Sequence, residues 1–531
     1  MIFKNELLET KELDNLQFNS SIKGSYSTMQ FVLKLNKEIR YYLNEPSETG
    51  FEKLQAFSTY LHETVHWWQH IGSNFGFILN SSFPAFAAGS ISQLKSLIDQ
   101  GIAIKSMLKY EKEYFQKKGI ADIHDINIIT NNFYDIEYAK LFCLDNKNIE
   151  DIAKDRRFFL SMGHCFHIMW TNSIQLYSDT FDPEFNLLPN FNNWVDKFKK
   201  LEQKKIPGFY PDSTTKVSPL GIRAIFEGQA IFNQITYLKN VFKENNIIFK
   251  DFIDQGYLHG IYLEAFDHFL RILEEERPIY FEDSLISLFL LVCDLSINPT
   301  NGFPLDIYDI ERFIDKNNPG MRFIFISSAV AENKGYFLQR CETPSKETYI
   351  ELSKLISKKL GLKCNYETLH IYKKWLDNDN IKNLLKEEET HEFKNINMPF
   401  RLFFAKFIKM QLDKIEYPEI FCWIGHYMAS GKSPAAQLFE KHKALFTDAE
   451  DGEIKPIIHE NIPHNNLLNT FNTFYFYTMM FELILKWISE EGEFKFDYRW
   501  LMNTRNEEVK SRLKEEFKKI FGIDIDSINV I

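Results

Sequence analysis

Two histidines and a glutamate stand at a spacing that suits metal chemistry in the segment His62-Glu63-Thr64-Val65-His66. Residues four apart lie on one face of an α-helix, so both imidazoles can reach a single metal ion. Glu63 lies one step round the helix, where it meets a metal-bound water rather than the ion. Zinc lowers the pKa of such a water from about 15.7 to about 7, and the carboxylate can then carry its proton to a leaving amine. The segment therefore predicts a zinc-dependent hydrolase.

The motif needs a helix to hold it. Chance alone produces the five-residue pattern in roughly three chains in a hundred of this histidine content, so the setting of the motif matters. We expect one helix from Phe51 to Phe75, with Ser47 or Thr49 as its N-cap. Its apolar residues recur at helical period and comprise Phe51, Leu54, Phe57, Leu61, Val65 and Trp68. Upstream, residues 29–43 have the composition of a strand, whose edge could hold an extended peptide by backbone pairing.

A tetrahedral catalytic zinc needs a third protein ligand and leaves its fourth position for water. We expect Glu227 to be that ligand, because it lies in a helical segment in which Gly228 and Ala230 would allow close approach to another helix. His70 lies on roughly the same helical face as the motif but about 12 Å along the axis from His62. We therefore expect His70 to pack near the site or to support a ligand rather than to bind the metal.

These two segments resemble the gluzincin zinc metallopeptidases, in which an HExxH helix packs against a second helix that supplies a glutamate ligand. In that family a small residue often follows the glutamate by three positions, as Ala230 follows Glu227 here. The resemblance covers roughly 25 residues in all. It implies Zn2+ bound by His62, His66 and Glu227, with Glu63 as the general base and a protein or peptide as the substrate.

One position departs from the pattern of that family. Several gluzincin groups place an aspartate four residues after the glutamate ligand to orient a zinc histidine, and this chain has Ile231 there. A different acceptor must therefore orient the ring. The alternatives are Gln229, Asn233, Asp294 and Asn298.

Peptide hydrolysis also needs a hydrogen-bond donor for the developing oxyanion, in addition to the metal. Five residues are candidates for this donor: Arg223, Tyr237, His259, Tyr262 and His268. The segment 257–268 holds three of the five, and we favour His259 as the catalytic donor. The competing interpretation makes His259 and His268 partly buried structural residues.

The periodicity of most segments is helical, which predicts a mainly α fold of the α+β class. We expect a zincin-like metallopeptidase domain over residues 1–305, which holds the small sheet and the HExxH helix. Residues 306–531 are then a mainly helical accessory or regulatory region, and the Asn298-Pro-Thr-Asn-Gly302 turn lies close to the boundary. A chain of 531 residues with 44% hydrophobic residues can bury a core of this size.

Composition narrows the class of protein further. The net charge of −11 argues against a broad nucleic-acid-binding face. Six cysteines without a CxxC pair indicate a reducing compartment, and the sequence contains neither a signal peptide nor an apolar run long enough to span a bilayer. We therefore expect a cytoplasmic bacterial protease of restricted specificity. The alternative is a catalytically inactive zinc-binding or peptide-binding helical protein that acts through a partner, although only chemistry requires a carboxylate at Glu63.

Overall fold

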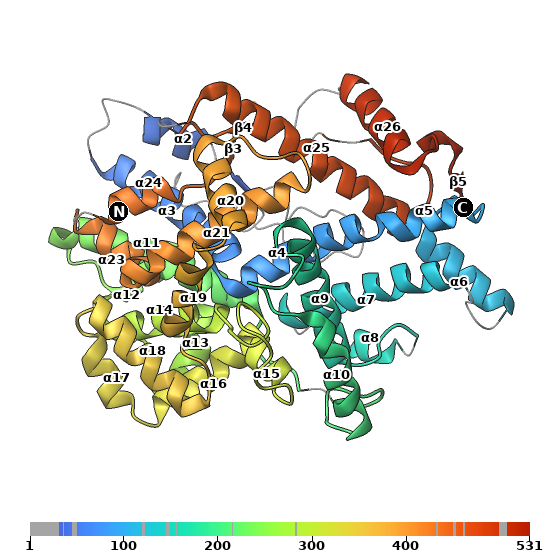
Figure 1. Ribbon diagram of the computed structural model, residues 1–531. Coiled ribbons are helices and arrows are strands. Elements are labelled where there is room, and N and C mark those ends of the chain that lie inside the picture. Colours follow the sequence, from blue (N-terminus) through green and yellow to red (C-terminus); the bar gives the residue numbers. More distant parts are fainter. Residues whose placement is uncertain are drawn as a thin grey trace.

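Helices make up most of the protein, and two small sheets complete it (Figure 1). The computed structural model describes residues 31–531 except 36, 45–49, 119–122, 145–148, 156, 215, 282–283, 432–433, 450–452, 460–461, 497 and 499–506. A mainly α fold with a small sheet is confirmed. No helix in these described ranges has both the length and the apolar character to cross a membrane.

The elements of the N-terminal part include the motif helix α3. They are β1 (Val32–Leu33), α2 (Lys37–Asn44), α3 (Phe51–Gly72), α4 (Asn74–Gly89), α5 (Ile91–Asp99), β2 (Ile104–Lys105), α6 (Met107–Lys118), α7 (His124–Leu144), α8 (Ile149–Lys154), α9 (Met162–Phe181), α10 (Trp194–Gln203), α11 (Ile222–Val241), α12 (Phe249–Asp254), α13 (Ile261–Leu273) and α14 (Ser284–Ile297). Short 3-10 turns lie at Phe191–Asn193 and Lys243–Asn245.

The C-terminal part is also mainly helical but supplies most of the strands. Its elements are α15 (Phe313–Asn317), α16 (Pro319–Ala331), α17 (Lys334–Cys341), α18 (Lys346–Leu360), α19 (Asn365–Trp375), α20 (Asp379–Thr390), α21 (Met398–Glu416), α22 (Pro418–Cys422), α23 (Ile424–Ala429), α24 (Ala435–Lys441), β3 (Phe446–Asp448), β4 (Ile454–Pro456), α25 (His464–Ser489), α26 (Glu507–Phe521), a 3-10 turn (Ile525–Ser527) and β5 (Asn529–Val530). One hydrophobic core includes side chains from both parts.

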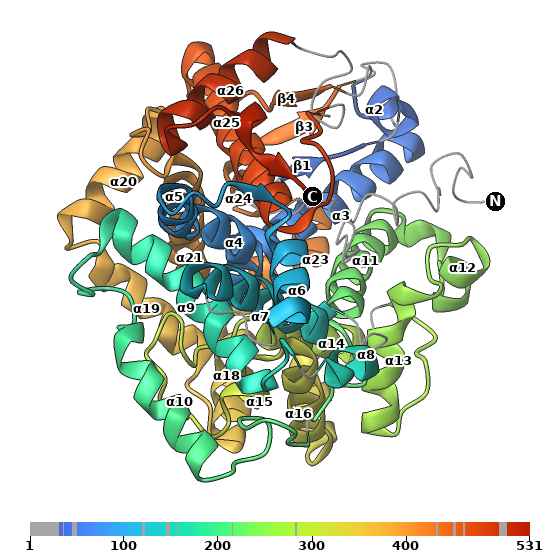
Figure 2. The same cartoon turned by 90° about the vertical axis from the view of Figure 1, so that its right-hand side faces the viewer.

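The two sheets join distant parts of the chain. In the first, β1 pairs in parallel with β3, which pairs antiparallel with β4, and Figure 2 shows these strands together beside α2. In the second, β2 pairs in parallel with β5. Two strands of the first sheet therefore come from the part of the chain that we expected to be an accessory region.

The strand predicted over residues 29–43 is wrong beyond Leu33, because residues 37–44 form helix α2. Ile39 is buried against Ala56 of α3, and Tyr42 and Leu43 pack on the same cluster. These spacings of three and four residues place the apolar side chains on one helical face. Packing against α3 therefore outweighs the strand-like composition. Residues 29–30 lie outside the described ranges.

Helix α3 carries the motif and is buried along most of its length. It begins after Gly50 and ends at Gly72, because Ser73 is extended and caps α4 with its side chain. The predicted N-caps at 47 and 49 lie outside the described residues. The helix packs along α11 and also contacts α2, α4 and α21 (Figure 1). The motif thus lies where four neighbouring helices fix the axis of α3.

The C-terminal end of α3 is held by residues from beyond the predicted boundary at residue 305. The side chains of Gln411 and Lys414 on α21 both donate to the carbonyl of Gly72, at 2.7 and 2.6 Å. A cation at a helix C-terminus also favours the helix dipole. Trp68 Nε1 donates to the carbonyl of His442 at 2.9 Å. The C-terminal part therefore helps to position the motif helix.

Buried charges hold α21 in place and predict acid sensitivity. Glu388 on α20 is 4% exposed and pairs with Lys406 and Lys409 of α21. Burial alone would raise the pKa of this carboxyl, but the two lysines hold its pKa at about 2, against an ordinary 4.5. A lowered pKa gives stability that is present above about pH 4.5 and is lost as the pH falls toward 2.

We therefore expect Glu388→Gln to destabilise the protein at pH 7 by about 3 kcal/mol, and this difference to shrink in acid. Urea unfolding of both proteins at several pH values between 7 and 3 measures it. A difference from wild type that does not change over this range would contradict the assigned pKa shift.

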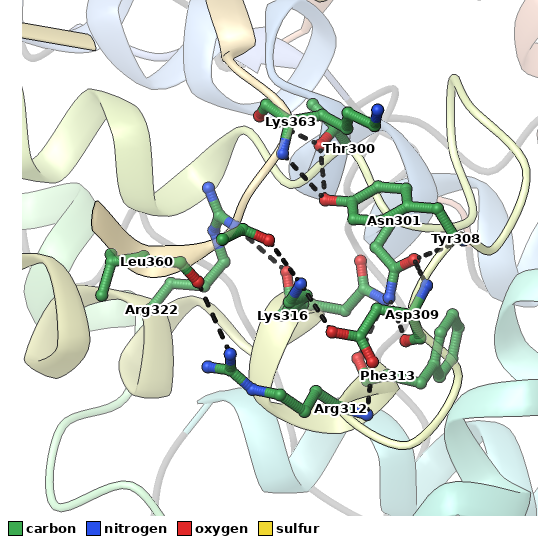
Figure 3. A network of polar contacts seen from close by, with 12 residues as sticks. Thr300, Asn301, Tyr308, Asp309, Arg312, Phe313, Lys316, Arg322, Leu360 and Lys363 are labelled. Atoms are coloured by element: carbon green, nitrogen blue, oxygen red, sulfur yellow. Dashed lines mark hydrogen bonds and ion pairs between the residues drawn. The ribbon is translucent and has the colours of Figure 1, made fainter. Parts of the chain in front are cut away.

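A second network fixes the chain after α14, and Figure 3 shows its part around Arg322, Lys316 and Arg312. Arg322 on α16 is buried and donates to the carbonyls of Leu295 at 2.6 Å, Ser296 at 3.0 Å and Lys316 at 3.1 Å. Two of these carbonyls belong to the last turn of α14 and have no partner within the helix. The adjacent side chain of Asn298 accepts from the backbone N–H of Asn74 at 3.2 Å, at the start of α4. The network thereby connects α14 with the helix that follows α3.

Arg322→Met is expected to lower the free energy of unfolding by about 3 kcal/mol or more, because buried carbonyls lose a charged donor. Arg312→Met serves as the matched control, since Arg312 belongs to the same network but is exposed. Its effect should stay within about 0.5 kcal/mol. Equal denaturant midpoints for the two variants would count against this role of Arg322.

Candidate metal centre

Three side chains from two helices converge at one point. His66 Nε2 lies 3.0 Å from His62 Nε2 and 3.3 Å from Glu227 Oε2, and His62 Nε2 lies 3.6 Å from that same oxygen. All three side chains are buried. Within the described ranges, no other three histidine, cysteine, aspartate or glutamate side chains bring their ligand atoms within 4.8 Å of one another. The structure thus brings together the three residues that the sequence predicted as ligands.

The three distances fit a tetrahedral zinc ion. Zinc bonds of about 2.0–2.1 Å to nitrogen and 2.0–2.2 Å to oxygen, at the tetrahedral angle, separate neighbouring ligand atoms by about 3.3–3.5 Å. The separations of 3.0, 3.3 and 3.6 Å lie on both sides of this value. Glu227 Oε2 is also buried and makes no hydrogen bond. A buried acceptor without a donor, facing two imidazole nitrogens, suits a cation between them.

The antiparallel packing of α3 and α11 sets this geometry. Gln234 Nε2 donates to Ser58 Oγ at 3.1 Å near one end of the contact, and Gln69 Nε2 donates to the carbonyl of Phe226 at 2.8 Å near the other. Glu227 lies between these two crossings, at the level of the motif histidines. The register between the helices therefore selects Glu227 as the side chain that meets them.

Gly228 has a different role from the one expected. A Cβ atom at this position would lie 3.0 Å from Phe289 Cζ and 3.5 Å from Ala265 Cβ. These residues belong to α14 and α13, so the glycine allows those helices, and not α3, to approach α11. The small residue therefore supports close packing of α13 and α14 on the ligand helix.

Electrostatics strengthens the grouping of these residues. Burial by itself would raise the pKa of Glu227, but the facing His66 and His62 hold this pKa at about 2. Burial would likewise lower the pKa of His66, and the charge of Glu227 instead raises it to about 9. A carboxylate that stays ionised is ready to bind a cation, although a proton on His66 would compete with that cation.

Glu63 stands beside the three residues without joining them. It is partly exposed, and burial of its carboxyl is the main cause of its raised pKa, which His62 and His66 oppose. The charge of Asp448, at the end of β3, also raises this pKa. This placement suits a group that handles protons next to the metal position.

The five candidates for the oxyanion donor are placed unequally. The ring centroid of Tyr262 lies 6.0 Å from that of His62, and the His259 ring lies 5.4 Å from that of Tyr262. Tyr237 packs instead on Phe57 at 5.4 Å. Tyr262 is thus the candidate that contacts a predicted ligand, with His259 behind it and partly exposed. The catalytic role of His259 stays a prediction.

The remaining two candidates show no such contact. His268 lies further along α13, where burial lowers its pKa. Arg223 lies one turn before Glu227 on α11, and its buried Nε makes no hydrogen bond.

The acceptor that orients His66 is Gln69, which was not among the four alternatives. Its Oε1 lies 2.8 Å from His66 Nδ1, and its Nε2 lies 2.9 Å from Gln229 Oε1. Gln229 therefore contributes indirectly, through Gln69. The other three bind elsewhere: Asn233 accepts from the N–H of Gly425, Asp294 accepts from Tyr349, and Asn298 donates to Asp294. The spacing of three residues from His66 to Gln69, on one helical face, was the available sequence signal.

His70 keeps the supporting position expected for it. Its Nδ1 lies 2.9 Å from Asn80 Nδ2 of α4, and its ring packs on Phe226 with centroids 5.2 Å apart. Burial lowers the pKa of His70 to about 3, so the ring stays neutral.

Comparison with known proteins gives no information on the function of these residues. No family model, curated protein or solved structure matches this chain. Functional inference therefore rests on the geometry and chemistry of the centre itself.

Proposed function

We propose that this protein is a zinc-dependent metallopeptidase with a zincin-like catalytic unit. His62, His66 and Glu227 would hold the ion, and Glu63 would act as the general base. One observation carries the proposal: three buried ligand atoms lie at tetrahedral spacing, and a carboxylate outside the ligand set adjoins them. Metal binding alone would require only the first three side chains.

Each side chain then has a defined task. Zinc, when bound, polarises the scissile carbonyl and acidifies water. Glu63 accepts the proton of the attacking water on its carboxylate and donates it to the nitrogen of the leaving amine. Tyr262, or His259 beside it, would donate a hydrogen bond to the oxygen on which negative charge develops. The burial of the ligands strengthens these interactions because bulk water screens them less.

The arrangement of the first sheet supports a peptide as the substrate. In the described ranges β1 is an edge strand that pairs only with β3, and we propose that an extended substrate chain pairs with its other edge. Arg40 bonds to the carbonyl of Leu35 at 2.9 Å and to that of Asp448 at 2.6 Å, which fixes the segment after β1 to the end of β3. This is the end of the sheet from which Asp448 acts on Glu63.

The cysteines bear on where such an enzyme would work. All six are buried and free of disulfides, which supports the proposal of a cytoplasmic protein. Burial also raises the pKa of Cys143 and Cys165 well above the ordinary value, so neither thiol is suited to nucleophilic catalysis.

Chelation and reloading test the proposal. The purified full-length protein is incubated with a quenched-fluorescence peptide library, and cleavage should stop with 1,10-phenanthroline and return with added Zn2+. Cleavage that persists in the zinc-free protein would refute the metal mechanism. Zinc binding without cleavage of the library, of casein or of denatured lysate protein would favour the alternative of a zinc-binding or peptide-binding module.

A further inference from the structure

We infer that Gln69 is a positioning residue for the metal centre. Its hydrogen bonds set the tautomer and orientation of the His66 ring, and they also connect α3 to α11. This inference rests on the proposed zinc site. It assigns to a neutral amide on the motif helix the orienting role that an aspartate of the second helix has in the gluzincin pattern. The side chain is 2% exposed, so its hydrogen bonds are made inside the protein.

The direction of the hydrogen bonds follows from a backbone carbonyl. The oxygen of Phe226 can only accept, and Gln69 Nε2 lies 2.8 Å from it. The amide nitrogen of Gln69 must therefore face α11. Its second N–H points to Gln229 Oε1 at 2.9 Å. Both N–H groups of Gln69 are thus used, and the amide cannot be turned round without placing two oxygens against each other.

This orientation of the Gln69 amide determines the tautomer of His66. With its nitrogen directed to α11, Gln69 presents Oε1 to His66 Nδ1 at 2.8 Å. An amide oxygen only accepts, so the proton of the neutral imidazole must be on Nδ1. The lone pair is then on Nε2, which is the atom that faces His62 Nε2 and Glu227 Oε2. A carbonyl on α11 therefore determines which nitrogen of a histidine on α3 can bind a metal.

The same hydrogen bonds align the third ligand. Gln69 reaches α11 at Phe226, one residue before Glu227, and at Gln229, two residues after it. The ligand glutamate is thus bracketed by both contacts, and sliding of α11 against α3 would break them together. His62 has no such orienting hydrogen bond, because its Nδ1 is buried and makes no hydrogen bond. Gln69 is therefore the main orienting contact of the ligand set.

Three substitutions separate positioning of the ligand from packing of the helices. Gln69→Leu removes the acceptor for His66. Gln69→Glu keeps an acceptor for His66 but loses both bonds to α11, because a carboxylate oxygen then faces the carbonyl of Phe226 and Oε1 of Gln229. Gln55→Leu is the matched control, since it removes an equally buried amide of the same helix, which bonds to Tyr257 and takes no part in the contacts of Gln69. Zinc affinity is measured by competition with a fluorescent chelator, and thermal unfolding of each metal-free protein reports on folding.

The inference predicts that Gln69→Leu weakens zinc binding by about 10–100-fold, as loss of an outer-shell partner does. Gln55→Leu should change the affinity by less than about threefold, and Gln69→Glu should bind zinc more tightly than Gln69→Leu. Equal loss in Gln69→Leu and Gln55→Leu, in step with their unfolding temperatures, would reduce Gln69 to a packing residue and overturn the inference.

A measurement on the wild type keeps the test independent of variant folding. Long-range proton–nitrogen NMR of the metal-free protein, at an alkaline pH where the imidazole is neutral, should show His66 with its proton on Nδ1. A proton on Nε2 would overturn the inference without bearing on zinc binding. A wild type that binds no zinc would instead refute the proposed function, and the inference with it, so the two failures are distinguishable.

Discussion

Glu63→Gln is expected to lower peptide hydrolysis by about 10²–10⁴-fold while the protein keeps its zinc. Glutamine has the same shape as glutamate but cannot take a proton from water. Glu63 lies outside the three-residue ligand group, so its replacement should leave metal binding intact. The drop should appear in kcat rather than in KM, because the lost step is a proton transfer in the transition state.

Glu52→Gln is a suitable control for this variant, because Glu52 lies in the first turn of the same helix, far from the motif. Activity, zinc content and thermal unfolding are compared for the three proteins. If Glu63→Gln cleaved the same peptides at the wild-type rate, Glu63 would not be the general base. If it lost zinc together with activity, the carboxylate would have to be counted as part of the metal site.

The second large effect concerns the ligands themselves. His62→Ala and Glu227→Ala should each weaken zinc binding by more than the roughly 100-fold expected from loss of an outer-shell partner, since each removes one of three protein ligands. The control is His70→Ala, a histidine of the same helix that bonds to Asn80 and stands outside the ligand group.

Isothermal titration of the metal-free proteins with zinc measures these affinities. The expected order is wild type and His70→Ala together, with both ligand variants far weaker. A Glu227→Ala protein that binds zinc as tightly as wild type would remove α11 from the site and leave a two-histidine arrangement with a different third ligand.

Local periodicity was sufficient to predict the helices that carry the centre. The apolar repeat of residues 51–75 predicts α3 to within three residues at its end, and the segment around Glu227 predicts α11. Both predictions depend on neighbours three and four positions apart, which the sequence displays directly. The convergence of His62, His66 and Glu227 then follows once the two helices pack in the observed register. The metal itself stays a prediction.

Features that depend on distant contacts could not be predicted in this way. Pairing of β1 with β3 joins residues more than 400 positions apart, so the prediction of a strand over residues 29–43 rested on local composition and was wrong for α2. The bond between Gln69 and Gln229 spans 160 positions. To predict that Gln69 is the acceptor for His66, one must know which residues of α11 face α3. That register is a property of the packed core.

The contacts by which the C-terminal part holds helix α3 could not be predicted from the sequence, for the same reason. Gln411 and Lys414 meet the end of α3 only after α21 has packed beside it. The prediction of a separate accessory region over 306–531 rested on the turn at residues 298–302, and such a turn does not show which helices lie on either side of it. Bonds to Gly72 show that this part contributes directly to the position of the motif helix.

Metal analysis of the purified full-length protein tests the central claim most directly. Wild type is stripped with a chelator, reloaded with Zn2+, freed of unbound metal by gel filtration and analysed by mass spectrometry of the element. The account predicts about one zinc per chain in wild type and far less in Glu227→Ala prepared in parallel. A well-folded wild type that retains no zinc after reloading would contradict it.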